Sequence, residues 1–300
     1  MNIASVDMKK ELEDYNRIAP RQKVSLLGSD FVYRYYRNPD PSVNATIVML
    51  AGGTGLGDGF FAFAKDFMKK YSLINFNYPM GYKNNEQLSD AIAALIEHIG
   101  AENVYFWGQS YGGALAQIIA KRHPEVVKGL ILTATASMSN HIRFEGMQCL
   151  VNMFNEEKEE KNIRTYKKLP MSLLPGILNL AFKKHLKDDP GAQKAVKELL
   201  KQVKPDLTKE YFCHMTHLLC DLRNYLGTCD EQDYAYLKGR VLIIEPDDDK
   251  TFTTDIKDEL IRIMPEPTVY RDIEGGHLAM LLDTDTCVRM VDDFMEKQEL

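Results

Sequence analysis

The sequence predicts an α/β fold, with a mostly parallel sheet of about eight strands, helices on both of its faces and an all-helical insertion. Short apolar runs alternate with amphipathic helices in residues 47–132 and again in 241–297. Strands buried on both faces are typically continuous apolar runs, and their alternation with helices indicates βαβ units. The stretch between these two parts has helical spacing and no convincing strand, so it is expected to be an insertion.

The expected elements follow in chain order. Residues 7–18 are expected to form a surface helix, and 24–27 and 31–37 a hairpin. The next strands are expected at 47–50, 73–76, 103–107 and 130–132, with helices at 60–68, 87–99 and 114–122 between them. The insertion has helical spacing near 147–154, 173–182, 195–203 and 211–226. The final part holds strands at 241–244 and 268–273 and helices at 255–263 and 287–297. We therefore expect a core domain of residues 1–137 and 233–300, with residues 138–232 as a helical cap.

Composition limits the classes of partner and compartment. The 300 residues carry a formal net charge of -6, which argues against nucleic acid and anionic membranes as partners. No stretch is long and apolar enough to span a membrane, and the charged N-terminal segment does not resemble a signal peptide. The five cysteines are odd in number and scattered, which is not the pattern of a disulfide framework. A cytoplasmic protein is therefore expected, whose oligomeric state the sequence leaves open.

A candidate nucleophile lies where the strand at 103–107 meets the helix at 114–122. The residues Gly108, Gln109, Ser110, Tyr111 and Gly112 match the pattern Gly-x-Ser-x-Gly, in which a serine stands at a sharp turn between strand and helix. Small neighbours are needed there because strand and helix approach closely. The alternative reading of this pattern alone is an ordinary tight turn of an α/β sheet.

A carboxylate and a histidine follow two other strands. Three aspartates, 247–249, come directly after the strand at 241–244, and His277 comes after the last strand, behind Gly275 and Gly276. The carboxyl ends of parallel strands meet at one edge of a sheet, where ligands bind. A serine, an aspartate and a histidine brought together there can act as nucleophile, orienting group and general base.

Backbone donors for a developing oxyanion are expected after the strand at 47–50. Gly53 is the first candidate and Thr54 the second, each acting together with the N–H of Tyr111. The alternative reading of this glycine-rich loop is a phosphate cradle, but the loop lacks the Lys-Ser/Thr end of a P-loop.

With these motifs in place, the chain resembles the α/β-hydrolase fold family over nearly all its length. The resemblance implies a cap between the sixth and seventh strands and a reaction that uses water as second nucleophile. It also implies that Asp249 is the acid, since Pro246 occupies the family's strand-ending glycine, with Asp248 as the fallback. The sequence departs from the family at Ala51, where a histidine usually precedes the two glycines.

The leading hypothesis is a serine hydrolase acting on a carboxylic ester, thioester, lactone or small amide. Ser110, His277 and Asp249 would form the catalytic triad, and no cofactor or metal is expected. The alternatives are a cofactor-free acyltransferase or lyase with the same triad, and a non-catalytic receptor for a small ligand. The Met-, Leu- and Phe-rich cap indicates a small-molecule substrate with a carbonyl centre that is partly apolar.

One further cluster has the residue types of a metal site. Cys213, His217 and Cys220 have a spacing that would place them on one face of a helix. Cysteine and histidine inside a helix are more often packing or surface residues, so zinc is not expected here.

Overall fold

The computed structural model describes residues 6–173, 176, 178, 182, 186 and 190–298. Its eight strands form one sheet in the order β1-β2-β4-β3-β5-β6-β7-β8. The strands are β1 (Arg21–Leu26), β2 (Ser29–Tyr36), β3 (Thr46–Leu50), β4 (Ser72–Asn75), β5 (Val104–Gln109), β6 (Gly129–Thr133), β7 (Val241–Ile244) and β8 (Thr268–Tyr270). Only the pairs β1-β2 and β2-β4 are antiparallel, so β2 alone runs against the direction of the other strands. The predicted α/β fold with a mostly parallel sheet is therefore confirmed.

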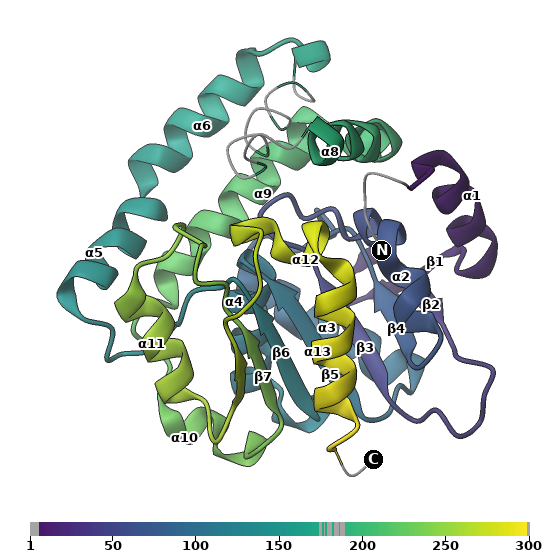
Figure 1. Cartoon of the computed structure of the whole chain (residues 1–300). Coiled ribbons are helices and arrows are strands. Elements are labelled where there is room, and N and C mark those ends of the chain that lie inside the picture. The colour runs from purple at the N-terminus through teal and green to yellow at the C-terminus, as the bar shows by residue number, and fades with distance from the viewer. Residues whose placement is uncertain are drawn as a thin grey trace.

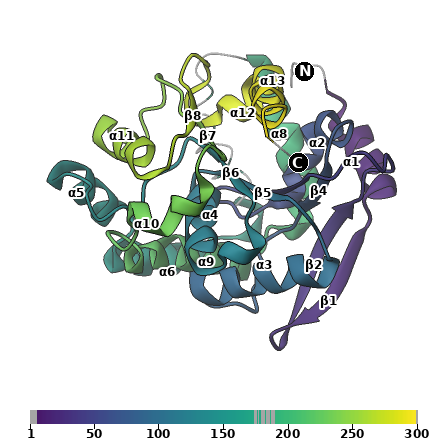
Figure 2. The same cartoon turned by 90° about the horizontal axis from the view of Figure 1, so that it is seen from below.

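Helices cover both faces of this sheet (Figures 1 and 2). On one face α2 (Phe61–Met68) lies against α13 (Thr284–Met295), and α1 (Met8–Ile18) packs on α2. On the other face α4 (Tyr111–Arg122) contacts both α3 (Asn85–Ile99) and α10 (Glu231–Tyr234). At the β8 end of the sheet lie α11 (Thr254–Ile263) and α12 (Ala279–Leu282) (Figure 2). The 3-10 helices of the core are η2 (Gly57–Phe60), η3 (Pro124–Val126), η7 (Ala235–Leu237) and η8 (Gly276–Leu278).

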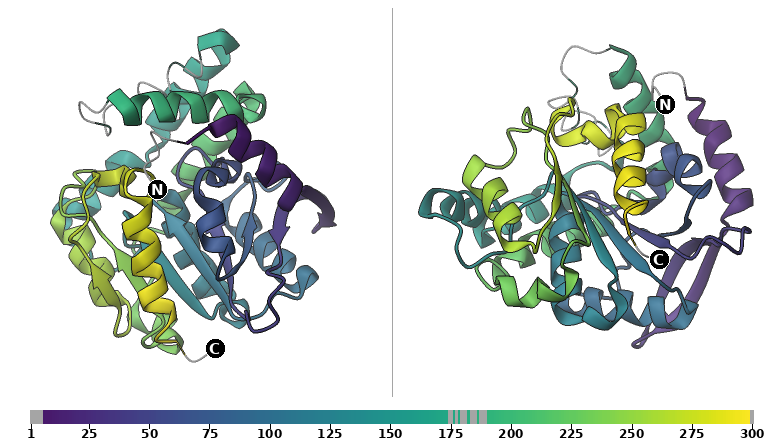
Figure 3. Two further views of the ribbon diagram at one scale, coloured as in Figure 1. Left: turned by 45° about the vertical axis from the view of Figure 1, so that its right-hand side comes forward. Right: turned by 60° about the horizontal axis from the view of Figure 1, so that its bottom comes forward.

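The predicted insertion after β6 is helical. Its elements are α5 (Phe144–Met153), α6 (Glu156–Lys168), η4 (Met171–Leu173), α8 (Pro190–Val203), η5 (Lys204–Asp206), α9 (Lys209–Asp221) and η6 (Leu222–Asn224). These helices lie over one edge of the sheet, away from the C-terminus (Figures 1 and 3). The helix predicted at 173–182 falls largely outside the described residues. The two ends of the insertion lie side by side. The Asn140 N–H donates to the Cys229 carbonyl, and the Cys229 N–H donates to the Met138 carbonyl.

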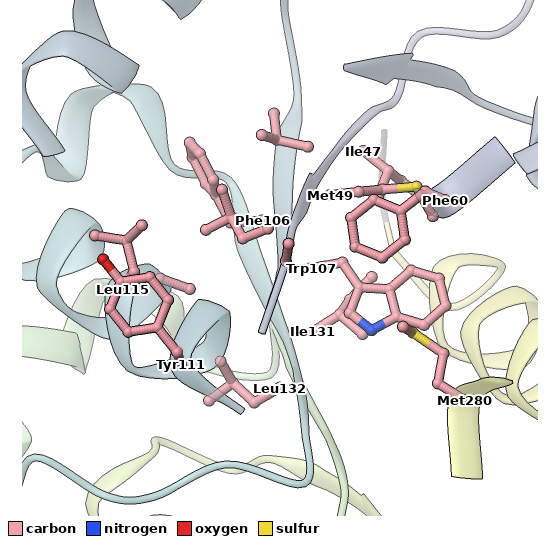
Figure 4. Close-up of a cluster of buried hydrophobic side chains, with 14 of the residues drawn as sticks. Ile47, Met49, Phe60, Phe106, Trp107, Tyr111, Leu115, Ile131, Leu132 and Met280 are labelled. Atoms are coloured by element: carbon pink, nitrogen blue, oxygen red, sulfur yellow. The ribbon is translucent and has the colours of Figure 1, made fainter. Parts of the chain in front are cut away.

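The core is built by the alternation of side chains along the central strand β5. Phe106 faces α4 with Tyr111 and Leu115, whereas Trp107 faces the opposite side, toward Phe60 and Met280 (Figure 4). Trp107 is only 2% exposed, and its indole N–H donates to Thr133 Oγ1 at 2.9 Å. It therefore packs in the core rather than facing a ligand site.

The register of the parallel strands sets where the functional loops emerge. Gln109, the last residue of β5, pairs with Thr133, and Thr133 pairs with Ile244, the last residue of β7. Because these strand ends are level, the loops that follow them leave the sheet side by side. This edge is the one over which the insertion lies.

Candidate active site

Ser110 lies at a strained turn between β5 and α4. Its φ of 54° and ψ of -117° are in a region that residues with a side chain rarely occupy. A Cβ added at Gly108 would lie 2.2 Å from the carbonyl oxygen of Gly112, and one at Gly112 would lie 2.2 Å from that of Leu50. Only glycine allows the helix to approach both strands so closely. The turn is held by Thr135, whose hydroxyl donates to the Ser110 carbonyl oxygen at 2.6 Å.

The structure brings Ser110, His277 and Asp249 into one hydrogen-bonded chain. The Oγ of Ser110 lies 2.9 Å from Nε2 of His277, and Nδ1 of His277 lies 2.8 Å from Oδ2 of Asp249. The Asp249 side chain is 1% exposed and that of His277 is 13% exposed. In a neutral imidazole whose Nδ1–H donates to the carboxylate, Nε2 is left to accept the serine proton. The geometry is therefore that of a serine coupled to a base.

The carboxyl group of Asp249 is held in its ionised form. Burial alone would raise its pKa, but the hydrogen bonds from His277 and Thr251 outweigh burial and bring the pKa below the ordinary 3.8. The Thr251 backbone N–H donates to Oδ1 at 2.8 Å, so both carboxylate oxygens have a donor. An ionised carboxylate at Nδ1 favours the imidazolium form that appears when Nε2 takes a proton.

The neighbouring Asp248 makes different contacts. Its carboxylate accepts hydrogen bonds from the backbone N–H groups of Gly276 at 2.8 Å and Gly275 at 3.3 Å. Gly275 has a φ of 118° and Gly276 a φ of 55°, so the chain can turn tightly before His277. Asp248 thus anchors the histidine loop to the aspartate turn, while Asp249 contacts the imidazole.

The three backbone N–H groups predicted as oxyanion donors lie in the loop after β3 and at the start of α4. The Gly55 N–H donates to the Gly52 carbonyl at 2.8 Å, which closes a tight turn, and Gly55 has a φ of 68°. Within the described chain, the N–H groups of Gly53 and Thr54 donate to no carbonyl. Tyr111 is the first residue of α4, so its N–H has no acceptor within the helix. All three groups remain available for a ligand oxygen at this edge of the sheet.

Sequence reasoning missed a buried polar network behind Tyr111. Its hydroxyl donates to Asn85 Oδ1 at 2.6 Å, and the N–H and Nδ2 of Asn85 donate to Asp221 of α9 at 2.8 and 2.9 Å. The only signal in the sequence is the pair Asn84 and Asn85, which is typical of a helix start. Asn84 caps α3, whereas Asn85 ties the residue after the nucleophile to the insertion.

A buried lysine that the sequence did not single out holds the turn that carries Asp249. Lys257 Nζ donates to the carbonyl oxygens of Asp249 at 2.7 Å and Pro246 at 3.0 Å. The same ammonium lies 3.8 Å from the carboxyl group of Glu245, which is fully buried. Burial raises the pKa of Glu245 to about 8, although the charge of Lys257 acts in the opposite direction.

A small cavity lies between the loop after β3 and the insertion. Its volume is about 160 Å³, and Gly53 and Thr54 form part of its wall together with residues of α6 and α9. A larger cavity of about 390 Å³ lies between β2 and η5, where Arg21 donates to Asp58 and Asp206. Arg21, Arg34, Asp58 and Asp206 in its wall pair with one another, and it does not touch the loop after β3. The smaller cavity is therefore the better candidate for a substrate group.

The metal-like cluster on α9 has other partners. His217 Nδ1 lies 2.5 Å from Glu159 of α6, and Arg223 donates to the same carboxylate. The described residues contain no group of three or more histidine, cysteine or acidic side chains suited to a metal ion. Among the helices of the described chain, none combines the length and the apolar character needed to cross a membrane.

Comparison with known proteins gives one matching family and several solved structures of similar fold. Residues 45–284 match the family described as alpha/beta hydrolase fold. The enol-lactonase from Burkholderia xenovorans LB400 is similar with a TM-score of 0.69 at 16% identity, over 92% of this chain and 100% of that one. The thermophilic esterase from Thermogutta terrifontis has a TM-score of 0.67 at 14% identity, over 92% and 98%. MGS-M2, an alpha/beta hydrolase enzyme from a Medee basin deep-sea metagenome library, has a TM-score of 0.65 at 17% identity, over 93% and 98%. At these identities the likeness shows a shared fold.

Proposed function

The chain belongs to the α/β-hydrolase fold family, and from this premise we propose that it is a serine hydrolase. The substrate is a carboxylic ester, thioester, lactone or small amide. The observation that carries the proposal is the hydrogen-bonded chain from Ser110 through His277 to Asp249. Two of the similar structures are named as an esterase and an enol-lactonase, which is the same class of reaction.

The proposed reaction proceeds through an acyl-enzyme. Ser110 Oγ attacks the substrate carbonyl carbon while His277 Nε2 takes the hydroxyl proton, and Asp249 stabilises the resulting imidazolium. The imidazolium then gives this proton to the leaving group. Water, activated by the same imidazole, attacks the acyl-enzyme and releases the acid. No metal or cofactor takes part in these steps.

The N–H groups of Gly53 and Tyr111 are proposed to hold the carbonyl oxygen as it becomes an oxyanion, with Thr54 as the further donor. The loss of one such donor typically costs about 3 to 4 kcal/mol of transition-state stabilisation. The position of Tyr111 at the start of α4 adds the positive end of the helix dipole to the same site.

The helices of residues 138–232 are proposed to act as a cap that covers the site, and the rest of the chain as the catalytic core. The substrate is expected to be partly apolar, because the cavity beside Gly53 is lined mainly by apolar side chains. All five cysteines are free thiols, which supports a reducing compartment such as the cytoplasm.

Labelling with a fluorophosphonate probe tests the nucleophile. The wild-type protein is expected to be labelled at Ser110, and Ser110→Ala is expected to abolish labelling and ester hydrolysis. Ser25→Ala is the matched control, since Ser25 is an exposed residue of β1 far from this edge. Labelling that persists in Ser110→Ala would overturn the assignment. Repeating the ester assay with an added alcohol or thiol separates hydrolysis from acyl transfer.

A further inference from the structure

The cavity beside the loop after β3 has a defined size and wall. It encloses about 160 Å³, and its wall includes Gly53, Tyr166, Phe212, Met215, Thr216 and Leu219. Leu219 reaches the loop, since a Cβ added at Gly53 would lie 4.0 Å from its Cδ2. Phe212 and Leu219 are seven residues apart on α9, which is two helical turns or about 10 Å along one face. The cavity therefore extends along α9 from the Gly53 end toward Phe212 and its ring partner Tyr166.

The chemistry of the wall selects an uncharged, apolar group. None of the described residues around the cavity is acidic or basic. The Tyr211 hydroxyl is already used, because it donates to the Gly55 carbonyl at 2.7 Å. Burial raises the pKa of Cys220 to about 11, so its thiol is uncharged at neutral pH. A carboxylate or ammonium placed here would lose its water without gaining an ionic partner, which is strongly unfavourable.

The position of the cavity distinguishes the two ends of a substrate. A carbonyl oxygen held by the Gly53 N–H places the carbonyl carbon next to this cavity. The leaving group must instead lie near His277 Nε2, which returns the proton to it. No described residue of the cavity wall belongs to the turn that carries Asp249 or to the loop that carries His277. Since Gly53 and Thr54 are the residues of the wall that belong to the predicted oxyanion loop, this arrangement favours the acyl group over the leaving group as the occupant of the cavity.

Buried contacts fix α9, so the cavity cannot widen easily. One end of α9 is tied to the loop by Tyr211 and Gly55, and the other by the hydrogen bonds between Asn85 and Asp221. Between them, Met215 packs so closely that a Cβ at Gly55 would lie 2.3 Å from its sulfur. In a well-packed pocket one surplus methylene is worth about 1 to 3 kcal/mol of discrimination.

We propose that this cavity is the acyl site, that it takes a neutral apolar acyl group of about six carbons, and that Leu219 and Phe212 set this limit. A dry apolar cavity of about 150 Å³ holds a benzene-sized ligand, which gives the limit of about six carbons. The inference rests on the proposed serine hydrolase and adds its substrate class. The acyl part is short and uncharged, and the cavity places no limit on the alcohol part.

The test is a series of 4-nitrophenyl esters from acetyl to dodecanoyl, assayed as kcat/KM. The wild-type value is expected to rise to about the hexanoyl ester and then to fall by at least about tenfold for two more carbons. The adipoyl ester, which has the same length but ends in a carboxylate, is expected to be at least about tenfold slower than the hexanoyl ester. A series of acetate esters with lengthening alcohols is expected to show no such limit.

Two variants and a control locate the limit. Each of the variants Leu219→Ala and Phe212→Ala is expected to move the optimum to longer acyl chains. For Leu219→Ala the shift is expected to be up to about three carbons, because the substitution removes three carbon atoms from the cavity wall. Val151→Ala is the matched control, because Val151 is an exposed residue of α5 outside the cavity wall, and its optimum is expected to stay unchanged.

These experiments distinguish failure of the proposed acyl site from failure of the proposed serine hydrolase. Fluorophosphonate labelling of Ser110 together with activity that is flat or still rising to dodecanoyl would overturn the acyl site and leave the hydrolase in place. The same holds if chain length matters only on the alcohol side, or if both variants keep the wild-type optimum. Absence of labelling would overturn the hydrolase itself.

Discussion

Glu245 is expected to make the stability of this protein fall as the pH rises. It follows the last residue of β7, and its side chain is fully buried. Neither carboxyl oxygen has a hydrogen-bond partner in the described chain, and the nearest cation, Lys257 Nζ, lies 3.8 Å away. Burial outweighs the opposing effects of the Lys257 charge and the Thr135 backbone N–H, so the pKa of Glu245 rises from 4.5 to about 8.

The size and sign of the effect follow from these two values. Between pH 4.5 and pH 8 the folded state holds a proton that the unfolded state has released, so the free energy of unfolding falls as the pH rises. The gap between the two pKa values, at about 1.4 kcal/mol for each unit, corresponds to about 5 kcal/mol in total. About 4 kcal/mol of this falls between pH 5 and pH 9. Glu245→Gln has a similar shape and cannot ionise, so this pH dependence is lost.

Urea denaturation of the wild type and Glu245→Gln at several pH values between 5 and 9 measures the effect. The free energy of unfolding of the variant, relative to the wild type, is expected to increase by about 4 kcal/mol across this range. The buried amide of the new glutamine changes the free energy of unfolding by the same amount at every pH, so it does not affect the dependence on pH. Glu160→Gln, at an exposed position of α6, is the control and is expected to show little slope. A difference between Glu245→Gln and the wild type that stays the same at pH 5 and pH 9 would refute the reasoning.

Three further predictions concern the site and its supports. Asp249→Asn is expected to lower kcat by about 1,000-fold to 10,000-fold, because the imidazole loses its orienting charge. Asp248→Asn only loosens the histidine loop and is expected to have a far smaller effect on kcat. Steady-state kinetics of the two variants compares them. Gly55→Ala is expected to lower the melting temperature more than Gly28→Ala, because both have positive φ but only Gly55 packs against the insertion. Lys257→Met leaves the carbonyl oxygens of Pro246 and Asp249 without their donor, so it is expected to lower the free energy of unfolding by about 2 to 5 kcal/mol. It also releases the turn that carries Asp249, so kcat is expected to fall more than KM changes. Denaturation and kinetics together check this, and unchanged kcat would contradict it.

Much of the fold could be predicted because its causes are local. A strand buried on both faces must be apolar throughout, and a helix that packs on a sheet must be apolar on one side. The turn at Ser110 was predictable for the same reason, since Gly108 and Gly112 stand where backbone atoms would collide with any side chain. The edge shared by Ser110 and His277 followed from parallel topology, which places the carboxyl ends of the strands together.

The choice between Asp248 and Asp249 shows where local reasoning ends. The two residues are adjacent on one turn, and chain order places both at the same edge. The resemblance to the family favoured Asp249, but the residues alone left both open. Only the path of the turn directs one carboxylate to the imidazole and the other to the N–H groups of Gly275 and Gly276.

By itself, the sequence determined the strands, the helices of the core, the serine turn and the edge at which its partners meet, because each depends on residues close together in the chain or on the order of strands. Three features came from tertiary packing: the hydrogen bonds of Asn85 to residues of α9 more than 130 positions away, the full burial of Glu245 and the cavity along α9. These features arise from packing between distant segments, and the periodicity of a single segment carries no record of what will pack against it.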